Sequence, residues 1–321
     1  MEIGEEDMDS KMLKALDCAI RDYETKGDIA QYGYKIENKI YENYMSNKTW
    51  KSFKEDMRKN YRDEFELGGG KELEERKTRY GLYPPKMACY GSSSRLIYLY
   101  SKNIEAFSFE RKLPTIVGGY ANLDGYKHNE SLDVYVEAKC REIYYSHSSI
   151  NVSNKYINVY DFIRDKMEMN LVFECDHQNE KDCCGVFKYK GEKIKHFDVK
   201  QLICHFLGIS AHMISAHMLN PKFNHNNTKI KFVYFIYNPK ELENLIDEKY
   251  RDKILETYKK TIDEIKIIIN NKGMELLFNA VYEFQKQNMS NQHLPLAHYI
   301  VPSFEFILTD QDEYKNAIEK V

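Results

Sequence analysis

The sequence predicts an α/β fold in which a mixed central sheet is flanked by helices, with helical additions at both ends. Three strand-like segments lie close together, an amphipathic helical segment follows them, and a further strand-like segment comes after that helix. Hydrophobic residues make up 42% of the 321 residues and charged residues 30%, which is typical of a globular chain and not of a disordered one.

Each element has its own local signal. Ser92, Ser93 and Ser94 precede an apolar run, so they predict the N-terminal cap of a short helix. Asn238 and Pro239 follow a compact aromatic run and end it, as expected for a buried strand. The expected strands cover 106–113, 119–126, 132–140 and 231–237, and the expected helices between them cover 160–169 and 197–218.

Breaks in these patterns divide the chain into three regions. Glycines at 68–70 interrupt the first helical stretch, and a long helical pattern resumes after Glu241, with Gly273 as its expected break. We therefore expect a helical N-terminal region at 1–67, a core at 68–240, and a mainly helical C-terminal region at 241–321 packed on the core. A short strand is expected at 304–308.

The composition restricts location and partners. No apolar run reaches the roughly 18–20 residues of a membrane helix, and the acidic N-terminus lacks the pattern of a signal peptide. We expect a cytoplasmic protein with no membrane partner, whose seven irregularly spaced cysteines are reduced. The net charge of -3 disfavours a nonspecific nucleic-acid coat protein but permits an enzyme that closes on DNA.

Two acids and a lysine form the candidate catalytic set. Glu137 and Lys139 share one face of a strand because side chains alternate, while Ala138 points into the core and Asp124 lies about one hairpin upstream. Carboxylates bind hard divalent cations, and a lysine beside them can orient a water for attack on a phosphodiester. The backbone carbonyl of Ala138 is expected to face the same metal.

The acid-lysine spacing alone is weak evidence, because a salt bridge on a solvated strand face produces it as well. An acid two residues before a lysine also occurs at Glu37, Glu75, Glu110, Asp198, Asp247 and Glu264. Only Glu137 lies in an alternating strand pattern with a second acidic strand residue upstream, which favours it over the others.

Further residues have two interpretations each. Glu110 is either a third acid of the site or a salt-bridge partner of its basic neighbours, and Asp133 is expected to be a peripheral surface acid. Gln201 and His205 are one helical turn apart and therefore share a helix face. This face either points at the metal or the scissile phosphate, or has only a structural role. A zinc clip in a polar loop is a further alternative, although the spacing of its ligands fits no standard pattern: Cys175, His177, Cys183 and Cys184.

Five ordered motifs between about 68 and 240 carry a family resemblance. They are Pro84-Pro85-Lys86-Met87-Ala88 with Ser92-Ser93-Ser94-Arg95, Phe109-Glu110-Arg111-Lys112-Leu113, Ala121-Asn122-Leu123-Asp124, Val136-Glu137-Ala138-Lys139, and Gln201-Leu202-Ile203-Cys204-His205-Phe206-Leu207-Gly208. The chain thereby resembles the PD-(D/E)XK, or restriction-endonuclease-like, nuclease superfamily, in a bacterial family typified by a Porphyromonas protein. The resemblance implies that fold, with Asp124 and Glu137 as metal ligands and Lys139 as the catalytic lysine. Gly125 departs from the pattern, since an apolar strand residue is expected after the aspartate.

The expected function is a magnesium-dependent DNA endonuclease of restriction or defence type, in which manganese substitutes for magnesium. A homodimer is expected because cutting both strands often requires two active sites, and a methyltransferase or other defence partner is left open. The alternative is a non-catalytic DNA-binding or protein-interaction module that retains the fold. A zinc-stabilised scaffold is a third hypothesis.

Overall fold

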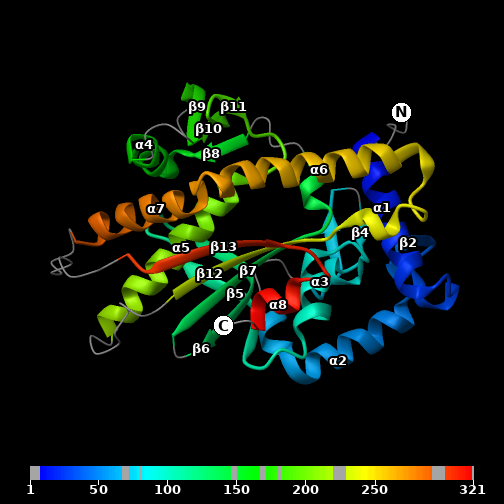
Figure 1. The fold of residues 1–321 in the computed structure, drawn as a ribbon. Coiled ribbons are helices and arrows are strands. Elements are labelled where there is room, and N and C mark those ends of the chain that lie inside the picture. Colours follow the sequence, from blue (N-terminus) through cyan, green and yellow to red (C-terminus); the bar gives the residue numbers. More distant parts are fainter. Residues whose placement is uncertain are drawn as a thin grey trace.

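The computed structural model describes residues 8–66, 72–79, 81–129, 131–145, 150–166, 171–178, 182–219, 229–290 and 301–319 (Figure 1). A five-stranded mixed sheet lies at its centre. The strands follow one another across this sheet in the order β13 (Ser303–Thr309), β12 (Lys229–Ile236), β7 (Leu132–Lys139), β6 (Tyr120–Asn129) and β5 (Phe107–Pro114).

The central sheet is half antiparallel and half parallel. β5, β6 and β7 form the expected antiparallel meander, whereas β12 runs parallel to both β7 and β13. All eight positions of β7 are buried, because strands pair with it on both sides and helices cover both faces. The mixed α/β class and the strands expected around 106–140, 231–237 and 304–308 are confirmed.

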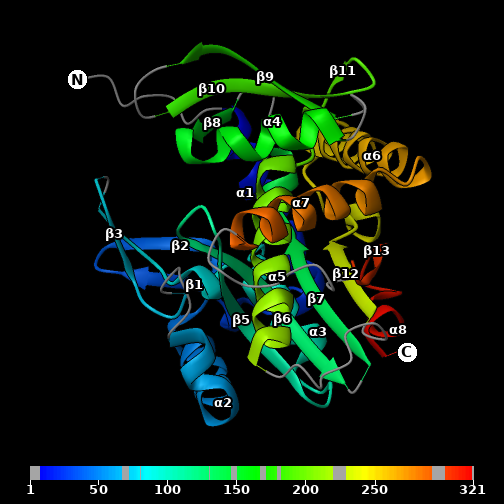
Figure 2. The same ribbon diagram turned by 90° about the vertical axis from the view of Figure 1, so that its left-hand side faces the viewer.

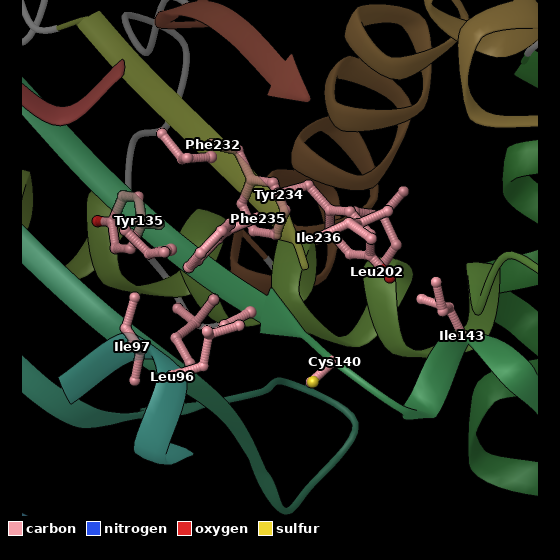
Figure 3. Packing of buried hydrophobic residues seen from close by; sticks show 14 of the residues in the cluster. Leu96, Ile97, Tyr135, Cys140, Ile143, Leu202, Phe232, Tyr234, Phe235 and Ile236 are labelled. Carbon is pink, nitrogen blue, oxygen red and sulfur yellow. The ribbon is translucent and has the colours of Figure 1, made fainter. Parts of the chain in front are cut away.

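Two layers of helices enclose the sheet. On one face, Phe206 of α5 (Val199–Leu219) contacts Phe232 of β12 and also Phe278 of α7 (Gly273–Ser290). On the other face, α3 (Ser93–Ser101) and α8 (Tyr314–Glu319) place Tyr100 and Tyr314 on Phe235. Figure 3 shows side chains of α3 and α5 packed around the strands of this core. No helix within the described ranges is both long enough and apolar enough to cross a membrane.

The connection from β7 to β12 contains a second sheet that the sequence did not predict. It is antiparallel, lies apart from the central sheet in Figure 2, and consists of β8 (Ile150–Ser153), β9 (Leu171–Gln178), β10 (Asp182–Tyr189) and β11 (Glu192–Lys193). Helix α4 (Ile157–Lys166) corresponds to the helix expected at 160–169. The sequence predicted that the four zinc candidates lie in a polar loop. This prediction is wrong, because their backbone forms the hairpin β9–β10.

The N-terminal region is not purely helical, which corrects the expectation for 1–67. Between α1 (Met8–Thr25) and α2 (Asn47–Glu66) lies a hairpin of β1 (Tyr32–Ile36) and β2 (Lys39–Met45). Gly27, with a φ of 77°, and Glu37, with a φ of 50°, adopt the left-handed conformation needed at the end of α1 and in the hairpin turn. A second, shorter hairpin follows, made of β3 (Arg76–Thr78) and β4 (Gly81–Tyr83).

The C-terminal region is part of the core and does not merely pack on it, because β13 adds a strand to the central sheet. The expected helix break is found between α6 (Glu248–Asn270) and α7, which begins at Gly273. The glycines at 68–70 lie outside the described residues. Short 3-10 helices complete the chain: η1 (Ile29–Gln31), η2 (Lys86–Ala88), η3 (Glu142–Tyr144), η4 (Asn154–Tyr156) and η6 (Pro239–Leu242).

Gly125, the departure from the family pattern, has a steric explanation. A Cβ atom at this position would lie 2.2 Å from Cζ of Phe107, whose buried ring crosses β6 at this point. Gly125 nevertheless pairs in register with Phe109 on one side and Val136 on the other, so β6 continues through it. The absence of a side chain therefore makes room for the aromatic core without interrupting the strand.

Candidate active site

Three carboxylates lie at one level across three neighbouring strands. The pairing of β6 with β7 stops at Gly125 and Val136, one residue before Asp124 and Glu137 would face each other. Glu110 lies opposite Asp124 on β5, between residues that pair in register with β6. Its φ of 50° departs from strand geometry. The meander therefore brings together three acids that are far apart in the sequence.

The backbone pairing of β6 with β7 stops because the side chain of Asp124 takes the place of a backbone partner. The backbone N–H of Ala138 donates to Oδ2 of Asp124 at 2.7 Å, so this carboxylate occupies the position of a strand partner. The N–H and C=O of one strand residue point to the same side, so the carbonyl of Ala138 also points toward β6. This direction agrees with the expectation that Ala138 contributes its carbonyl next to Asp124.

Glu137 is the centre of a hydrogen-bonded network. Its Oε1 accepts from Lys139 Nζ at 2.6 Å and from Gln201 Nε2 at 2.8 Å, while Gln201 Oε1 accepts from the same Nζ at 2.6 Å. Nε2 of His205 lies 3.1 Å from Oε2, but this buried oxygen has no hydrogen-bond partner with acceptable geometry. Both helical residues that the sequence singled out therefore reach Glu137.

The pKa values of the three acids are shifted in different directions because their surroundings differ. Burial alone would raise the pKa of Glu137, but Lys139 and His205 lower it to about 2, so this group is ionised. Burial, followed by repulsion from Glu137 and Glu110, raises the pKa of Asp124 well above its ordinary value. Burial, followed by repulsion from Glu72, raises the pKa of Glu110 to about 7. Burial and mutual repulsion therefore disfavour the ionised forms of Asp124 and Glu110, and a cation bound next to them would offset this repulsion.

These groups line an acidic cavity of about 530 Å³ at the end of the sheet where β7 stops. The N-terminal end of α3 opens into it through Ser93 and Ser94, and the partial positive charge of a helix N-terminus stabilises nearby anions. The carboxylates that line the cavity outnumber its lysines: they are Glu72, Glu110, Asp124, Glu137, Glu142 and Asp198, against Lys86 and Lys139. The cavity therefore attracts cations.

Carboxylate oxygens such as those in this cavity are the ligands that magnesium prefers in proteins. In the described ranges, no three His, Cys, Asp or Glu side chains are grouped closely enough to form a complete metal cluster. Magnesium in nucleic-acid enzymes is usually held by one or two carboxylates together with waters and substrate phosphate. Asp124 and Glu137 would supply those carboxylates, and Oε2 of Glu137, although 3.1 Å from Nε2 of His205, makes no hydrogen bond of acceptable geometry.

Two other expectations from the sequence concern Asp133 and the zinc candidates. Asp133 is not a surface acid: it is only 4% exposed, accepts a hydrogen bond from the Tyr126 hydroxyl at 2.6 Å, and lies 2.7 Å from Nδ1 of His128. Among the zinc candidates, Cys184 is exposed on β10 and its backbone pairs with that of His177. The side chains of His177, Cys175 and Cys183 lie outside the described residues.

Sequence reasoning missed several residues of the cavity. Glu72, Lys86 and Glu142 are brought to it by the loop before β3, by η2 and by η3, and the Glu72–Lys86 ion pair at 2.8 Å borders it. Glu142 lies three residues after the end of β7, and Asp198 directly precedes α5. Their positions at the ends of the two elements that carry the site were a usable signal.

Glu110→Gln is expected to raise the free energy of unfolding at pH 8 by up to about 3 kcal/mol, and by much less at pH 4. The pKa of Glu110 is raised from 4.5 to about 7, so between these pH values the folded protein retains a proton that the unfolded chain has lost. The contribution of Glu110 to stability therefore falls as the pH rises through this window, whereas glutamine does not ionise.

Urea unfolding at pH 4, 6 and 8 measures this difference, with exposed Glu243→Gln as the control. An equal effect of Glu110→Gln at all three pH values would show that packing, and not ionisation, is responsible.

The sequence matches no protein-family model, no curated protein and no solved structure. The geometry of the cavity therefore carries the functional argument.

Proposed function

We propose that this chain is a metal-dependent endonuclease that hydrolyses DNA phosphodiester bonds, with a restriction-endonuclease-like core. The alignment of Glu110, Asp124 and Glu137 across β5, β6 and β7, with Lys139 fixed beside them, is the observation that carries the proposal. It combines a cation-attracting cavity with a positioned ammonium group, the two requirements of phosphodiester hydrolysis.

Each residue has a distinct role in this proposal. Asp124, Glu137 and the carbonyl of Ala138 would hold magnesium, for which manganese substitutes, and the ion supplies Lewis acidity at the phosphate. Lys139 places its ammonium where negative charge develops on the phosphate or where water attacks. Gln201 fixes that ammonium through its 2.6 Å contact, so it is a positioning residue. His205 orients Glu137 from the opposite side.

The biological setting follows from the same proposal. A restriction or defence nuclease cuts both DNA strands, which is most simply achieved by a homodimer with two active sites. A cytoplasmic location fits such an enzyme, and a methyltransferase would be its natural partner where host DNA must be protected.

The alternative is a non-catalytic DNA-binding or protein-interaction module. Oε1 of Glu137 is fully engaged by Lys139 and Gln201, an arrangement that satisfies the charge without any cation. In that case the ion pair would stabilise the fold, and DNA contacts would come from lysine and arginine alone.

The dependence of DNA binding and cleavage on divalent cations distinguishes the nuclease from the non-catalytic module. Gel-shift and plasmid-cleavage assays run at fixed ionic strength should show binding and cleavage with magnesium or manganese, binding without cleavage with calcium, and no cleavage with chelator. Calcium accepts the same oxygen ligands but tolerates longer bonds and irregular geometry, so it supports docking and aligns the attacking water poorly. If no cation permits cleavage of linear, supercoiled or single-stranded DNA, and binding is indifferent to cations, the interaction module replaces the enzyme.

A further inference from the structure

A second cavity, of about 560 Å³, adjoins the acidic one. It is bounded by α1, by the hairpins β1–β2 and β3–β4, and by residues that follow β7, and Figure 2 shows the two hairpins together on one side of the molecule. Tyr145 lines both cavities, and Arg141 and Glu142, adjacent in sequence, line one each. A ligand that occupied the second cavity would therefore reach the edge of the candidate active site.

The charge of the second cavity is opposite to that of the first. Among its described lining residues, Asp17 is the one acid, and it is buried in an ion pair with Arg141. Within the described ranges, no carboxylate pairs with Lys14, Lys39 or Arg76. The basic residues of the lining are Lys14, Lys39, Arg76, Arg79 and Arg141. Such a surface attracts polyanions.

Tyrosine rings are interleaved with these cations. Tyr41 and Tyr83, one from each hairpin, have ring centroids 5.6 Å apart, and Lys39 Nζ lies 4.7 Å from the first ring and 5.3 Å from the second. The Tyr41 hydroxyl donates to the carbonyl of Leu82 at 2.8 Å, which ties the hairpins together. Tyr145 is 46% exposed at the junction of the cavities. Aromatic faces beside cations are the chemistry that binds unpaired bases and their phosphates.

The hairpins also expose apolar side chains next to these rings. Ile40 is 61% exposed and lines the cavity, and Leu82 is 39% exposed at the neighbouring hairpin. Proteins that separate stacked bases commonly insert apolar side chains of this kind between them. Their position favours a substrate in which a base has left the stack.

Arg141 is fixed between the two cavities. Its Nη1 donates to Oδ2 of buried Asp17 at 3.1 Å, and Asn43 donates to the same oxygen at 2.8 Å. Gly91 packs against this carboxylate so closely that a Cβ atom there would lie 1.8 Å from Asp17 Oδ1. Arg141 follows Lys139 by two residues, so this anchored guanidinium group lies in the segment that leads from β7 into η3.

We propose that the second cavity binds an unpaired nucleotide of the DNA strand next to the scissile phosphate, with Tyr145 stacking on its base. Lys14, Lys39 and Arg141 contact the phosphates on either side of it. The preferred substrate is then DNA that is single-stranded or contains an extruded base near the cleavage position. The part that concerns cleavage rests on the proposed nuclease function, whereas the nucleotide site is testable by binding alone.

The test measures binding in calcium, which is expected to support docking without cleavage, by fluorescence anisotropy of three DNA probes. These are a full duplex, a duplex with one unpaired nucleotide, and a single strand. We expect Tyr145→Ala to weaken binding of the two unpaired probes about tenfold and to change duplex binding less than twofold, because a base–aromatic stack is lost. The control is Tyr120→Ala, whose side chain is 63% exposed and lines neither cavity.

The cationic part is tested with the double variant Lys14→Ala and Lys39→Ala, both of which are exposed. The slope of log K against log salt should fall by about one to two, as expected for two lost phosphate contacts. Exposed Lys259→Ala, on α6, should leave the slope unchanged.

Equal binding of all three probes, or tighter binding of the corresponding RNA strand, would overturn the inference. If the wild-type protein cleaves DNA but Tyr145→Ala binds all three probes as tightly as wild type does, the nucleotide site is also overturned. The proposed nuclease function then remains. Conversely, selective binding through Tyr145 without cleavage under any cation supports the nucleotide site and removes the nuclease.

Discussion

Glu137→Gln is expected to lower the rate of DNA cleavage by roughly a thousandfold or more, because it removes a charged ligand from the centre of the site. The amide is close in shape to the carboxylate and can still accept hydrogen bonds from Lys139 and Gln201, so the network around it retains its acceptor. It cannot supply the negative charge that Glu137 holds with a pKa of about 2. Because Glu137→Gln also leaves the buried Lys139 ammonium without its counter-charge, the free energy of unfolding should fall as well, and cleavage is compared at a temperature at which the variant is folded.

Initial cleavage rates at saturating magnesium, together with calorimetric titration of magnesium, measure both effects. Glu243→Gln, at an exposed position outside the cavity, is the matched control and should behave as wild type. Unchanged magnesium affinity in Glu137→Gln would contradict its assignment as a ligand, even if the rate fell.

Lys139→Met is expected to destabilise the fold by about 3–5 kcal/mol at pH 7, since it leaves a buried carboxylate without its closest counter-charge. Lys139 and Glu137 are both buried, and their contact of 2.6 Å is reinforced by Gln201. Methionine preserves most of the side-chain volume, so the loss reports the missing charge and not a void.

A double-mutant cycle isolates this interaction by urea unfolding. Adding Glu137→Gln to Lys139→Met should restore most of the lost stability, because the uncompensated charge is then absent. Lys86→Met is the matched control within the same cavity: its partner is Glu72, but Lys86 is half-exposed, and such pairs contribute at most about 1 kcal/mol. Equal losses in Lys139→Met and Lys86→Met would mean that the Lys139 ion pair has no special role.

The central strands could be predicted because their signals are local. β7 and β12 are rich in apolar and β-branched residues, and β5 and β6 alternate buried apolar residues with more exposed ones over part of their length. The strands that were missed give mixed signals: in β9 and β10, Phe187 and Tyr189 are buried, but Glu174 and Lys188 form an ion pair across the hairpin. β1 and β2 likewise expose charged residues, which mask the buried Tyr34 and Tyr44 in the sequence pattern.

The candidate site was predictable to the extent that it depends on one strand and one helix. The two-residue period places Glu137 and Lys139 together, and the helical period places Gln201 and His205 together. The positions of Glu110 and Asp133 depend on neighbours across the sheet. Glu110 belongs to the cavity because β5 aligns it with Asp124, and Asp133 is buried because Tyr126 of the paired strand covers it. The sequence indicated Asp124 as a neighbour of Glu137 across a hairpin, but it did not establish the register that aligns Glu110 and covers Asp133.

The strand β13 has a consequence for how the protein is made. It supplies one border of the central sheet, yet it is synthesised more than sixty residues after β12, the strand it pairs with. Until residues 303–309 leave the ribosome, β12 presents an unpaired row of N–H and C=O groups, a surface on which nascent chains associate wrongly. Tyr314, whose hydroxyl lies 2.7 Å from Ser101 Oγ, then joins parts of the chain 213 residues apart. The central sheet can therefore be completed only after residues 303–309 have emerged, and these long-range contacts are expected to form slowly.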